Sequence, residues 1–545
     1  MGIYDKIFKP KKLVLSDGKV VEEKRTRTPL VLLLLLIATV ISVRITGFSL
    51  NTILTRGNQF FVILGQMFPP KTGYLSSIWG PLLDTIKMSL LGSFIGGVLA
   101  IPFAILASSN LVKNKVVLGV VRIFLSIVRT IPTLVAALIA TYIWGLGTMA
   151  GTVAIAVFTF AYVGKQLYEL IETVDMGAYE AMEAMGAGRA QAFLAAIQPQ
   201  VLPAYLSVCL FCFEGNVRYA AILGYVGAGG LGLILNEKIG WREYDSVGMI
   251  LVVLFGTVRH SAIIFVRSLP RRGQGRMKKE IDKMYEQEPK TWYAKILVAL
   301  IVAALLAWSM STVQSGTTGG DGLTVAGKII SGIFHPDTAL LFNFTTSGVA
   351  YLLLETMCIA FLGTIVGAVL SIPLSFLAAA NLVPKPIALI FRVFIMAIRT
   401  IPAFVYGLMF IRVTGPGPFA GLLTMSLCSI GMISKMFIES IEDLDTKILE
   451  SLDAAGCTMF QKIRYGILSQ LFPDFMSTLI YRFDMNLRDA TVLGLVGAGG
   501  IGAPLIFAMS AYKWNQVGAI LAGLIVLILI VEVISTKIRV KLTRG

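Results

Sequence analysis

Four arginines lie within long apolar stretches of this 545-residue chain, where a charged side chain is most able to act on a solute. Arg129 and Arg399 each stand shortly before a helix-breaking proline, and Arg218 and Arg488 lie deep in a later apolar stretch. A charge at bilayer depth costs about 2.5–3.5 kcal/mol on insertion scales, so such residues normally face water or an ionic partner. The planar guanidinium group suits the oxygens of phosphate or phosphonate. These arginines therefore predict an electropositive pathway or gate for an oxyanion.

An internal ion pair is an equally good interpretation for two of these arginines. Arg218 is close in sequence to Glu214, and Arg488 is close to Asp484. Intramembrane charges commonly pair with one another. Both interpretations therefore stay open for these two positions.

The other two arginines, Arg129 and Arg399, have no acidic residue near them in the sequence. This favours a role in a pathway or gate, because unpaired intramembrane charges usually face an aqueous cavity. The chain is internally duplicated, as described below, and pseudo-symmetry would bring each arginine near its twin. The matched asparagines Asn216 and Asn486 are further candidates for the pathway.

The composition is that of an integral membrane protein. Hydrophobic residues make up 56% of the chain, charged residues only 14%, and the mean hydropathy is +0.80. A soluble globular chain carries about 25% charged residues. A soluble enzyme, a secreted disulfide-rich domain and a disordered protein are therefore excluded. The net charge of +16 is typical of basic cytoplasmic loops and not of a nucleic-acid-binding domain.

Apolar segments and basic loops predict about twelve transmembrane helices, with both termini in the cytoplasm. The first six segments lie near 29–49, 82–108, 116–145, 148–172, 200–235 and 245–268. The second six lie near 293–313, 350–378, 386–412, 417–442, 474–506 and 514–536. The predicted organisation is a cytoplasmic tail at 1–28, a first half at 29–268, a cytoplasmic linker at 269–292, a second half at 293–536 and a cytoplasmic tail at 537–545. The fold class is an all-α polytopic membrane protein.

The two halves are a tandem duplication with a spacing of about 270 residues throughout. Each repeat has an even number of crossings, so both copies face the same way and are related by an axis along the membrane normal. The repeated motifs are Leu82-Leu83-Asp84-Thr85 with Leu353-Leu354-Glu355-Thr356, Arg129-Thr130-Ile131-Pro132 with Arg399-Thr400-Ile401-Pro402, and Asn216-Val217-Arg218 with Asn486-Leu487-Arg488. A pathway between the halves follows from this symmetry.

Prolines and glycines mark the expected breaks in the helices. These are Pro132, Pro402, Gly227, Gly229, Gly230, Gly497, Gly499 and Gly500. The glycines form a G-x-G-x-x-G pattern, but a dinucleotide site needs a preceding strand in a soluble βαβ unit, and here they interrupt apolar segments. The chain has no G-x-x-x-x-G-K-[ST] motif, so it carries no P-loop ATPase of its own.

The longest cytoplasmic loop of each half predicts a short helical hairpin with a glycine at its turn. An ordinary interfacial amphipathic helix is the alternative interpretation. The residues concerned are Glu180, Ala181, Glu183 and Gly186 in the first half, and Glu450, Asp453 and Gly456 in the second.

These loops resemble the coupling motif of permease subunits of binding-protein-dependent ABC importers, and the chain as a whole is most similar to phosphonate-importer permeases. The matching motifs are Arg399-Thr400-Ile401-Pro402, Pro373-Leu374-Ser375-Phe376, Tyr481-Arg482-Phe483-Asp484-Met485-Asn486 and Val496-Gly497-Ala498-Gly499-Gly500. The resemblance implies a type I importer permease (MetI-like) fold in a prokaryotic inner membrane, with the loop residues named above contacting the ATPase. It also implies two ATPase subunits that bind ATP and magnesium, an extracytoplasmic solute-binding protein, and a phosphonate, phosphate or phosphite substrate.

Two departures from the family pattern concern the fusion and the loops. The family often has one half per chain, whereas this chain fuses both. The second loop has Asp453 where the first has Glu183, and Ser469 where the first has Pro199. These differences predict unequal contacts with the two ATPase subunits.

Three other functions are weighed against this one. A permease for another solute such as an amino acid would share the loops, and an ion-coupled secondary transporter would share the repeats and the buried charge. A membrane enzyme lacks support, because the chain has no catalytic constellation of histidines, cysteines or paired carboxylates. His260 and His335 are far apart, and Cys209 and Cys212 form a CxxC within an apolar segment, so no metal site and no cofactor in this chain are expected.

Overall fold

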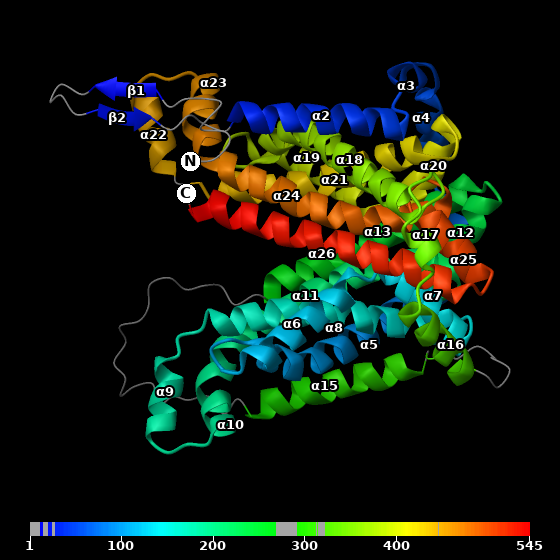
Figure 1. The fold of residues 1–545 in the computed structure, drawn as a ribbon, viewed down its shortest axis with the longest axis horizontal. Coiled ribbons are helices and arrows are strands. Elements are labelled where there is room, and N and C mark those ends of the chain that lie inside the picture. Colours follow the sequence, from blue (N-terminus) through cyan, green and yellow to red (C-terminus); the bar gives the residue numbers. More distant parts are fainter. Residues whose placement is uncertain are drawn as a thin grey trace.

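The computed structural model describes residues 11–14, 20–23, 28–268, 292–311, 313, 322–444 and 446–544. Nearly all of them are helical, which confirms the predicted all-α fold class (Figure 1). A hairpin of two antiparallel strands, β1 (Lys11–Val14) and β2 (Val20–Glu23), is an addition that the sequence analysis did not predict. The predicted linker at 269–292 lies outside the described residues except for its last residue.

The helices of the first half follow one another as the apolar pattern predicts. They are α2 (Thr28–Thr46), α3 (Leu50–Arg56), α4 (Asn58–Gln66), η1 (Thr72–Tyr74), α5 (Leu75–Ala107), α6 (Lys115–Thr130), α7 (Thr133–Trp144), α8 (Thr148–Glu172), α9 (Gly177–Ala184), α10 (Arg189–Ala192), η2 (Phe193–Ile197), α11 (Gln198–Leu223), η3 (Gly224–Val226), α12 (Leu231–Gly240) and α13 (Tyr244–Ser268).

The second half repeats this order. Its helices are α15 (Trp292–Met310), α16 (Gly322–Phe334), α17 (Thr338–Leu341), α18 (Val349–Ala378), α19 (Lys385–Thr400), α20 (Ala403–Thr414), α21 (Pro418–Glu442), α22 (Thr446–Ala454), α23 (Met459–Gln461), η4 (Lys462–Ile467), α24 (Leu468–Leu493), η5 (Gly494–Val496), α25 (Gly502–Ser510) and α26 (Trp514–Arg544). The predicted C-terminal tail therefore continues the last helix.

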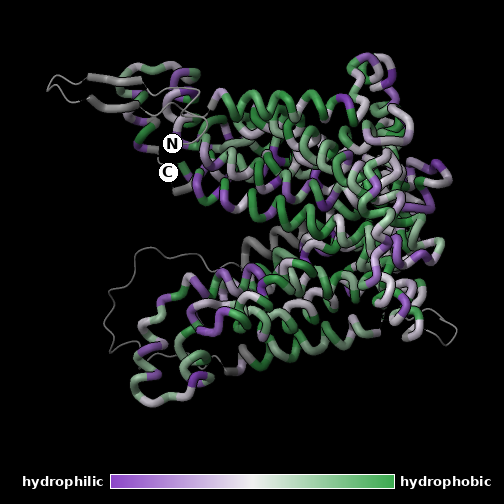
Figure 2. Tube along the Cα trace, in the orientation of Figure 1, coloured by the Kyte–Doolittle hydropathy of each residue, from purple (hydrophilic) through white to green (hydrophobic). Residues whose placement is uncertain are grey.

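Seven of the described helices are long and apolar enough to cross a membrane, and two bent helix pairs raise this number to nine. Helices α13, α15 and α24 occupy the three remaining predicted spans. Figure 2 shows hydrophobic residues along the long helices and hydrophilic residues gathered mainly at the helix ends and the short hairpins. Leucines such as Leu32 and Leu36 on α2 are exposed, as expected for side chains that face lipid.

Each bent pair breaks at the motif Arg-Thr-Ile-Pro. The angle is 85° between α6 and α7 and 84° between α19 and α20. Ile131, which precedes Pro132, is extended with φ −70° and ψ 118°, because the proline ring disfavours a helical residue before it. Pro132 then precedes α7, where its missing N–H costs nothing. The bend places Arg129 in the last turn of the first segment.

The first helix of each half packs on the other half. Helix α2 lies against α18 and α21, and α15 lies against α5 (Figure 1). Lys87 on α5 fixes the second contact, because its ammonium group lies 3.3 Å from the Ser311 hydroxyl and 4.8 Å from the centre of the Trp308 ring. The two halves are therefore continuous in sequence but exchanged at their first helices in space.

A buried asparagine joins three helices in each half. The Asn216 side-chain amide donates to the hydroxyls of Ser93 (2.8 Å) on α5 and Thr159 (2.9 Å) on α8. Asn486 on α24 likewise donates to Thr364 on α18 (2.8 Å) and Ser429 on α21 (2.7 Å). Both asparagines are fully buried, so these bonds hold α11 and α24 against their neighbours.

We expect Asn486→Ala to destabilise the protein. It removes two interhelical hydrogen bonds, each worth about 0.6 kcal/mol in membrane proteins, and opens a small cavity, so a total of about 1–2 kcal/mol is lost. The check is the melting temperature of the purified chain in detergent, which should fall by a few degrees. The control is Asn51→Ala at an exposed position of α3. Equal melting temperatures for the two variants would contradict the packing role.

Candidate functional site

The second-half arginine at the bend, Arg399, pairs with a carboxylate of the first half. Its Nη2 lies 3.1 Å from Oε1 of Glu214 on α11. Arg218, one turn further along α11, lies 3.7 Å from the same oxygen. The Glu214 side chain is only 8% exposed. One buried carboxylate is therefore shared by two arginines, one from each half.

The first-half arginine at the bend, Arg129, pairs with Glu532 on α26. The ammonium group of Lys165 on α8 donates to Oε1 of Glu532 at 3.2 Å. Arg488 donates to Asp484 at 2.6 Å, and its Nη2 lies 4.0 Å from Oε2 of Glu532. Three cations therefore surround the Glu532 carboxylate, two from the first half and one from the second.

We call the set of charged residues where the two halves meet the charged seam. It has two parts, named after their central carboxylates. The Glu532 cluster consists of Arg129, Lys165, Glu169, Asp484, Arg488 and Glu532. The Glu214 cluster consists of Glu214, Arg218 and Arg399, together with the ion pair of Lys435 and Glu439, which lies within electrostatic range of them. In both clusters a carboxylate of one half meets cations of the other, so the seam joins the two halves inside the membrane.

The seam differs from the sequence expectation in one respect. Arg129 and Arg399 were expected to lack acidic neighbours and to approach each other, but each contacts a carboxylate from the opposite half. The ion pairs within α11 and α24, left open by the sequence, are both present. The pathway role predicted for Asn216 and Asn486 stays a prediction, while their geometry gives them a role in helix packing.

Five residues of the seam were missed by the sequence analysis, namely Glu532, Lys165, Lys435 and the acidic partners Glu169 and Glu439. Glu532 is an acidic residue near the C-terminal end of the last apolar segment, and an isolated carboxylate in such a segment indicates a partner or a functional role. Lys165 and Lys435 are also intramembrane charges, about 270 residues apart like the repeated arginines. Their partners lie on distant helices, so only the tertiary structure reveals the pairing.

The glycine motifs form a tight connection after α11 and after α24. Gly227 and Gly497 adopt left-handed conformations, with φ of +81° and +83°, which favour glycine. The backbone N–H of Leu231 donates to the Thr85 hydroxyl at 2.8 Å, and this bond ties the connection to α5. A helix and not a strand precedes the glycines, so the requirement of a dinucleotide site is not met.

The predicted hairpins are present at one end of the molecule. Helices α9 and α10 form the first and α22 and α23 the second, and the start of α2 and the end of α26 lie at this same end (Figure 1). Gly186 and Gly456 make the turns with φ of +88° and +73°. Glu180, Ala181, Glu183, Glu450 and Asp453 are all exposed. This surface is accessible to a partner.

The two hairpins are held differently. In the first, the Tyr179 hydroxyl donates to Glu183 at 3.1 Å. The pKa of Tyr179 is raised mainly by burial and, to a smaller extent, by the hydrogen bond and negative charge of Glu183. In the second, Asp453 forms an ion pair with Lys462. The partners also differ between the halves, because the positions equivalent to Tyr179 and Lys462 are Leu449 and Ala192. The unequal contacts with ATPase subunits stay a prediction.

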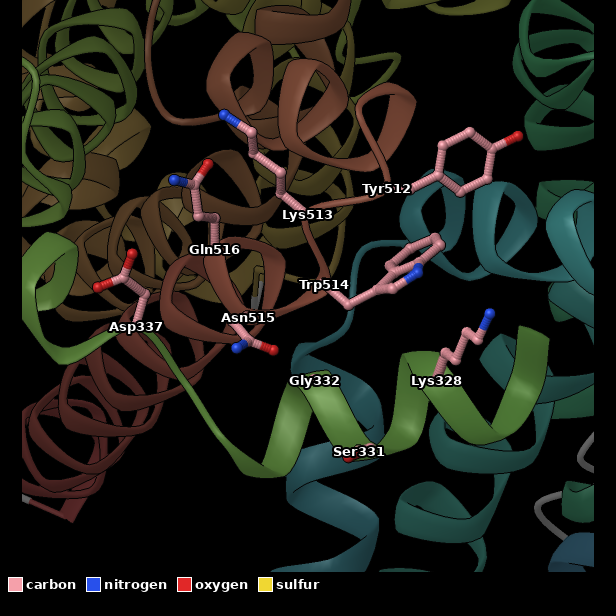
Figure 3. A pocket seen from close by; sticks show the side chains of 9 residues that line it. All are labelled: Lys328, Ser331, Gly332, Asp337, Tyr512, Lys513, Trp514, Asn515 and Gln516. Carbon is pink, nitrogen blue, oxygen red and sulfur yellow. The ribbon is translucent and has the colours of Figure 1, made fainter. Parts of the chain in front are cut away.

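A pocket of about 520 Å³ lies at the opposite end of the molecule, between α16 and the start of α26. Figure 3 shows that the ammonium groups of its two lysines, Lys328 and Lys513, point in different directions. They do not converge on one position, so this pocket is a weaker candidate for an anion site than the seam. Within the described ranges, no three metal-binding side chains come together.

Comparison with known proteins identifies a family and several relatives. Residues 100–272 and 371–539 match the family "Binding-protein-dependent transport system inner membrane component". The phosphate-import permease protein PhnE of Mycolicibacterium smegmatis is 27% identical over 93% of both chains. The phosphite transport system permease protein PtxC of Stutzerimonas stutzeri is 35% identical over 34% of this chain and 68% of its own length.

A solved structure of the MetNI methionine ABC transporter in an inward-facing conformation also shows similarity. The match has a TM-score of 0.33 and 19% identity, and it covers 36% of this chain and 95% of the MetNI chain.

We predict that Glu214 and Arg399 are energetically coupled. Glu214→Gln leaves two partly buried arginines without their carboxylate, and because breaking a fully buried pair costs about 3–5 kcal/mol, the loss here should lie below that range. The double variant Glu214→Gln/Arg399→Gln removes one of these arginines as well, so it should be more stable than Glu214→Gln alone. Thermal unfolding of the purified variants measures this coupling. Strictly additive losses would show that the two side chains act independently.

Proposed function

The chain belongs to the family of binding-protein-dependent transport system inner membrane components, and from this premise we propose that it is the fused permease of an ATP-driven importer for phosphonate, phosphate or phosphite. The family match occurs once in each half, in agreement with the tandem duplication. The resemblance to importer permeases noted from the motifs is thereby confirmed. Relatives named as phosphate and phosphite permeases support the substrate class.

The observation that carries the substrate proposal is the charged seam. Its four arginines, Arg129, Arg218, Arg399 and Arg488, lie at the boundary between the halves and come from both of them. Guanidinium groups bind phosphorus oxyanions through paired N–H donors. Rocking of the halves would separate the cross-half pairs and free these donors for a passing anion. We therefore assign the arginines to the pathway or its gate.

The hairpins are proposed to seat the chain on two ATPase subunits. The exposed side chains of Met185 and Phe460 add apolar area near the two turns, which suits a protein groove. In this arrangement the hairpin end and both termini are cytoplasmic, and a solute-binding protein contacts the opposite end. ATP and magnesium bind to the ATPase subunits, and this chain carries out no bond chemistry.

We predict that Gly186→Val weakens association with the ATPase subunits. Valine at a positive φ is strained by about 1–2 kcal/mol, so the turn will shift and misplace Glu180. Gly188→Val is the matched control, because Gly188 lies on the same hairpin at φ −62°. Co-purification of the ATPase should fall several-fold for Gly186→Val only. Wild-type yield of the complex together with normal uptake would remove the turn from the coupling surface.

We further predict that uphill transport requires ATP. The chain reconstituted alone should not concentrate phosphate, phosphite or methylphosphonate under a proton or sodium gradient, since it has no P-loop. The complete complex with ATPase and binding protein should do so when ATP is supplied. Uptake is measured with radiolabelled substrate in proteoliposomes. Accumulation driven by an ion gradient would favour a secondary transporter instead, and ATP-driven uptake of an amino acid but of no phosphorus oxyanion would favour another permease class.

A further inference from the structure

The two parts of the charged seam are related by the internal duplication. Each residue of the Glu214 cluster has a counterpart in the Glu532 cluster at a spacing of about 270 residues. The counterparts are Arg399 and Arg129, Lys435 and Lys165, Glu439 and Glu169, Glu214 and Asp484, and Arg218 and Arg488. Corresponding charges therefore recur in both halves.

Glu532 is the one residue of the seam without a charged counterpart, because the equivalent position in the first half of the sequence is Ala262. The Glu532 cluster contains three cations and three carboxylates, so its formal charge is zero. The Glu214 cluster contains three cations and two carboxylates, so its formal charge is +1. The two clusters of the seam therefore differ in formal charge by one, because only one of them contains the Glu532 carboxylate.

The extra carboxylate changes the partner of the bend arginine. In the Glu214 cluster Arg399 contacts Glu214, which is the counterpart of Asp484. In the Glu532 cluster Arg129 contacts Glu532, and Asp484 pairs with Arg488. Glu532 therefore takes the position of an anion between a bend arginine and a lysine of the same half.

The two equivalent lysines, Lys165 and Lys435, also differ in the carboxylate that they contact. Lys165 lies 3.2 Å from the carboxylate of Glu532, whose side chain is 14% exposed. Its counterpart Lys435 lies 3.6 Å from Glu439, whose side chain is 61% exposed, and its ammonium group faces the Phe211 ring at 5.6 Å. Lys435 also lies within electrostatic range of Arg399, Arg218 and Glu214. A local excess of positive charge attracts an anion, and it does so more strongly where water is excluded.

We propose that the translocated oxyanion binds at the Glu214 cluster, to Arg399, Arg218 and Lys435, and that in the Glu532 cluster the equivalent anion position is filled by the carboxylate of Glu532 itself. This proposal rests on the substrate class proposed above. It gives the seam one site for the oxyanion in place of two symmetric ones. It also makes Glu532 a residue that determines how many anions the permease holds.

The test compares two equivalent lysines. The full chain with its ATPase subunits is placed in nanodiscs, and binding of radiolabelled orthophosphate is measured by equilibrium dialysis. Lys435→Gln should raise the dissociation constant at least tenfold, whereas Lys165→Gln, in the cluster already filled by Glu532, should change it less than twofold. Equal losses in both variants would overturn the assignment of the site to the Glu214 cluster.

A third variant tests the role of Glu532. Glu532→Gln keeps the shape of the side chain and raises the formal charge of its cluster to +1, so the number of phosphates bound per chain should rise from one to two. A ratio that stays at one in a variant with wild-type elution on size exclusion would overturn the role given to Glu532. If the variant aggregates, the comparison of the two lysines decides the proposal alone. A wild-type complex that binds neither phosphate, phosphite nor methylphosphonate would count against the proposed function itself.

Discussion

The cost of placing charge in a medium of low dielectric constant governs the centre of this molecule. Each intramembrane arginine needs a carboxylate or water, and the described structure supplies carboxylates from the opposite half to Arg129 and Arg399. The same pairs that reduce the electrostatic cost also join the halves. In the proposed transport cycle the halves move relative to each other, so the residues that hold them together would also be the residues exposed by that movement. The proposal thus links the stability of one state to the pathway that opens in the other.

The duplication supplies symmetry, and single substitutions modify it. The bends, the asparagine contacts and the hairpin turns recur in both halves with nearly the same geometry. Fusion of two halves into one chain allows each copy to change independently, which a homodimer of single halves cannot do. The Glu532 carboxylate and the Glu183 and Asp453 difference are two products of this freedom. One lies at the seam and the other at the hairpin surface.

Much of the architecture follows from local sequence. Apolar length predicts the spans, the residue before Pro132 predicts the bend, and Gly186 and Gly456 predict the turns, because each depends on a few neighbouring residues. The ion pairs between the two halves were not predicted, since Glu532 and Arg129 meet only after helices from distant parts of the chain pack together. The packing of α2 and α15 on the opposite halves could not be predicted from the sequence either. A helix that is apolar on every face can contact lipid on any side, so its sequence has no pattern that identifies the neighbouring helix.

The exchange of first helices has a consequence for the biogenesis of the protein. Helix α2 leaves the ribosome first, yet its packing partners α18 and α21 are synthesised only after the whole first half. Membrane insertion of α2 and its final docking are therefore separate events in time, in keeping with a two-stage course of membrane protein folding. Until α15 is made, the face of α5 that α15 covers is open to lipid, while α8, α11 and α6 already pack on the rest of α5. The packing of the first half is therefore completed only when the second half has been synthesised, and the two halves reach their final structure together.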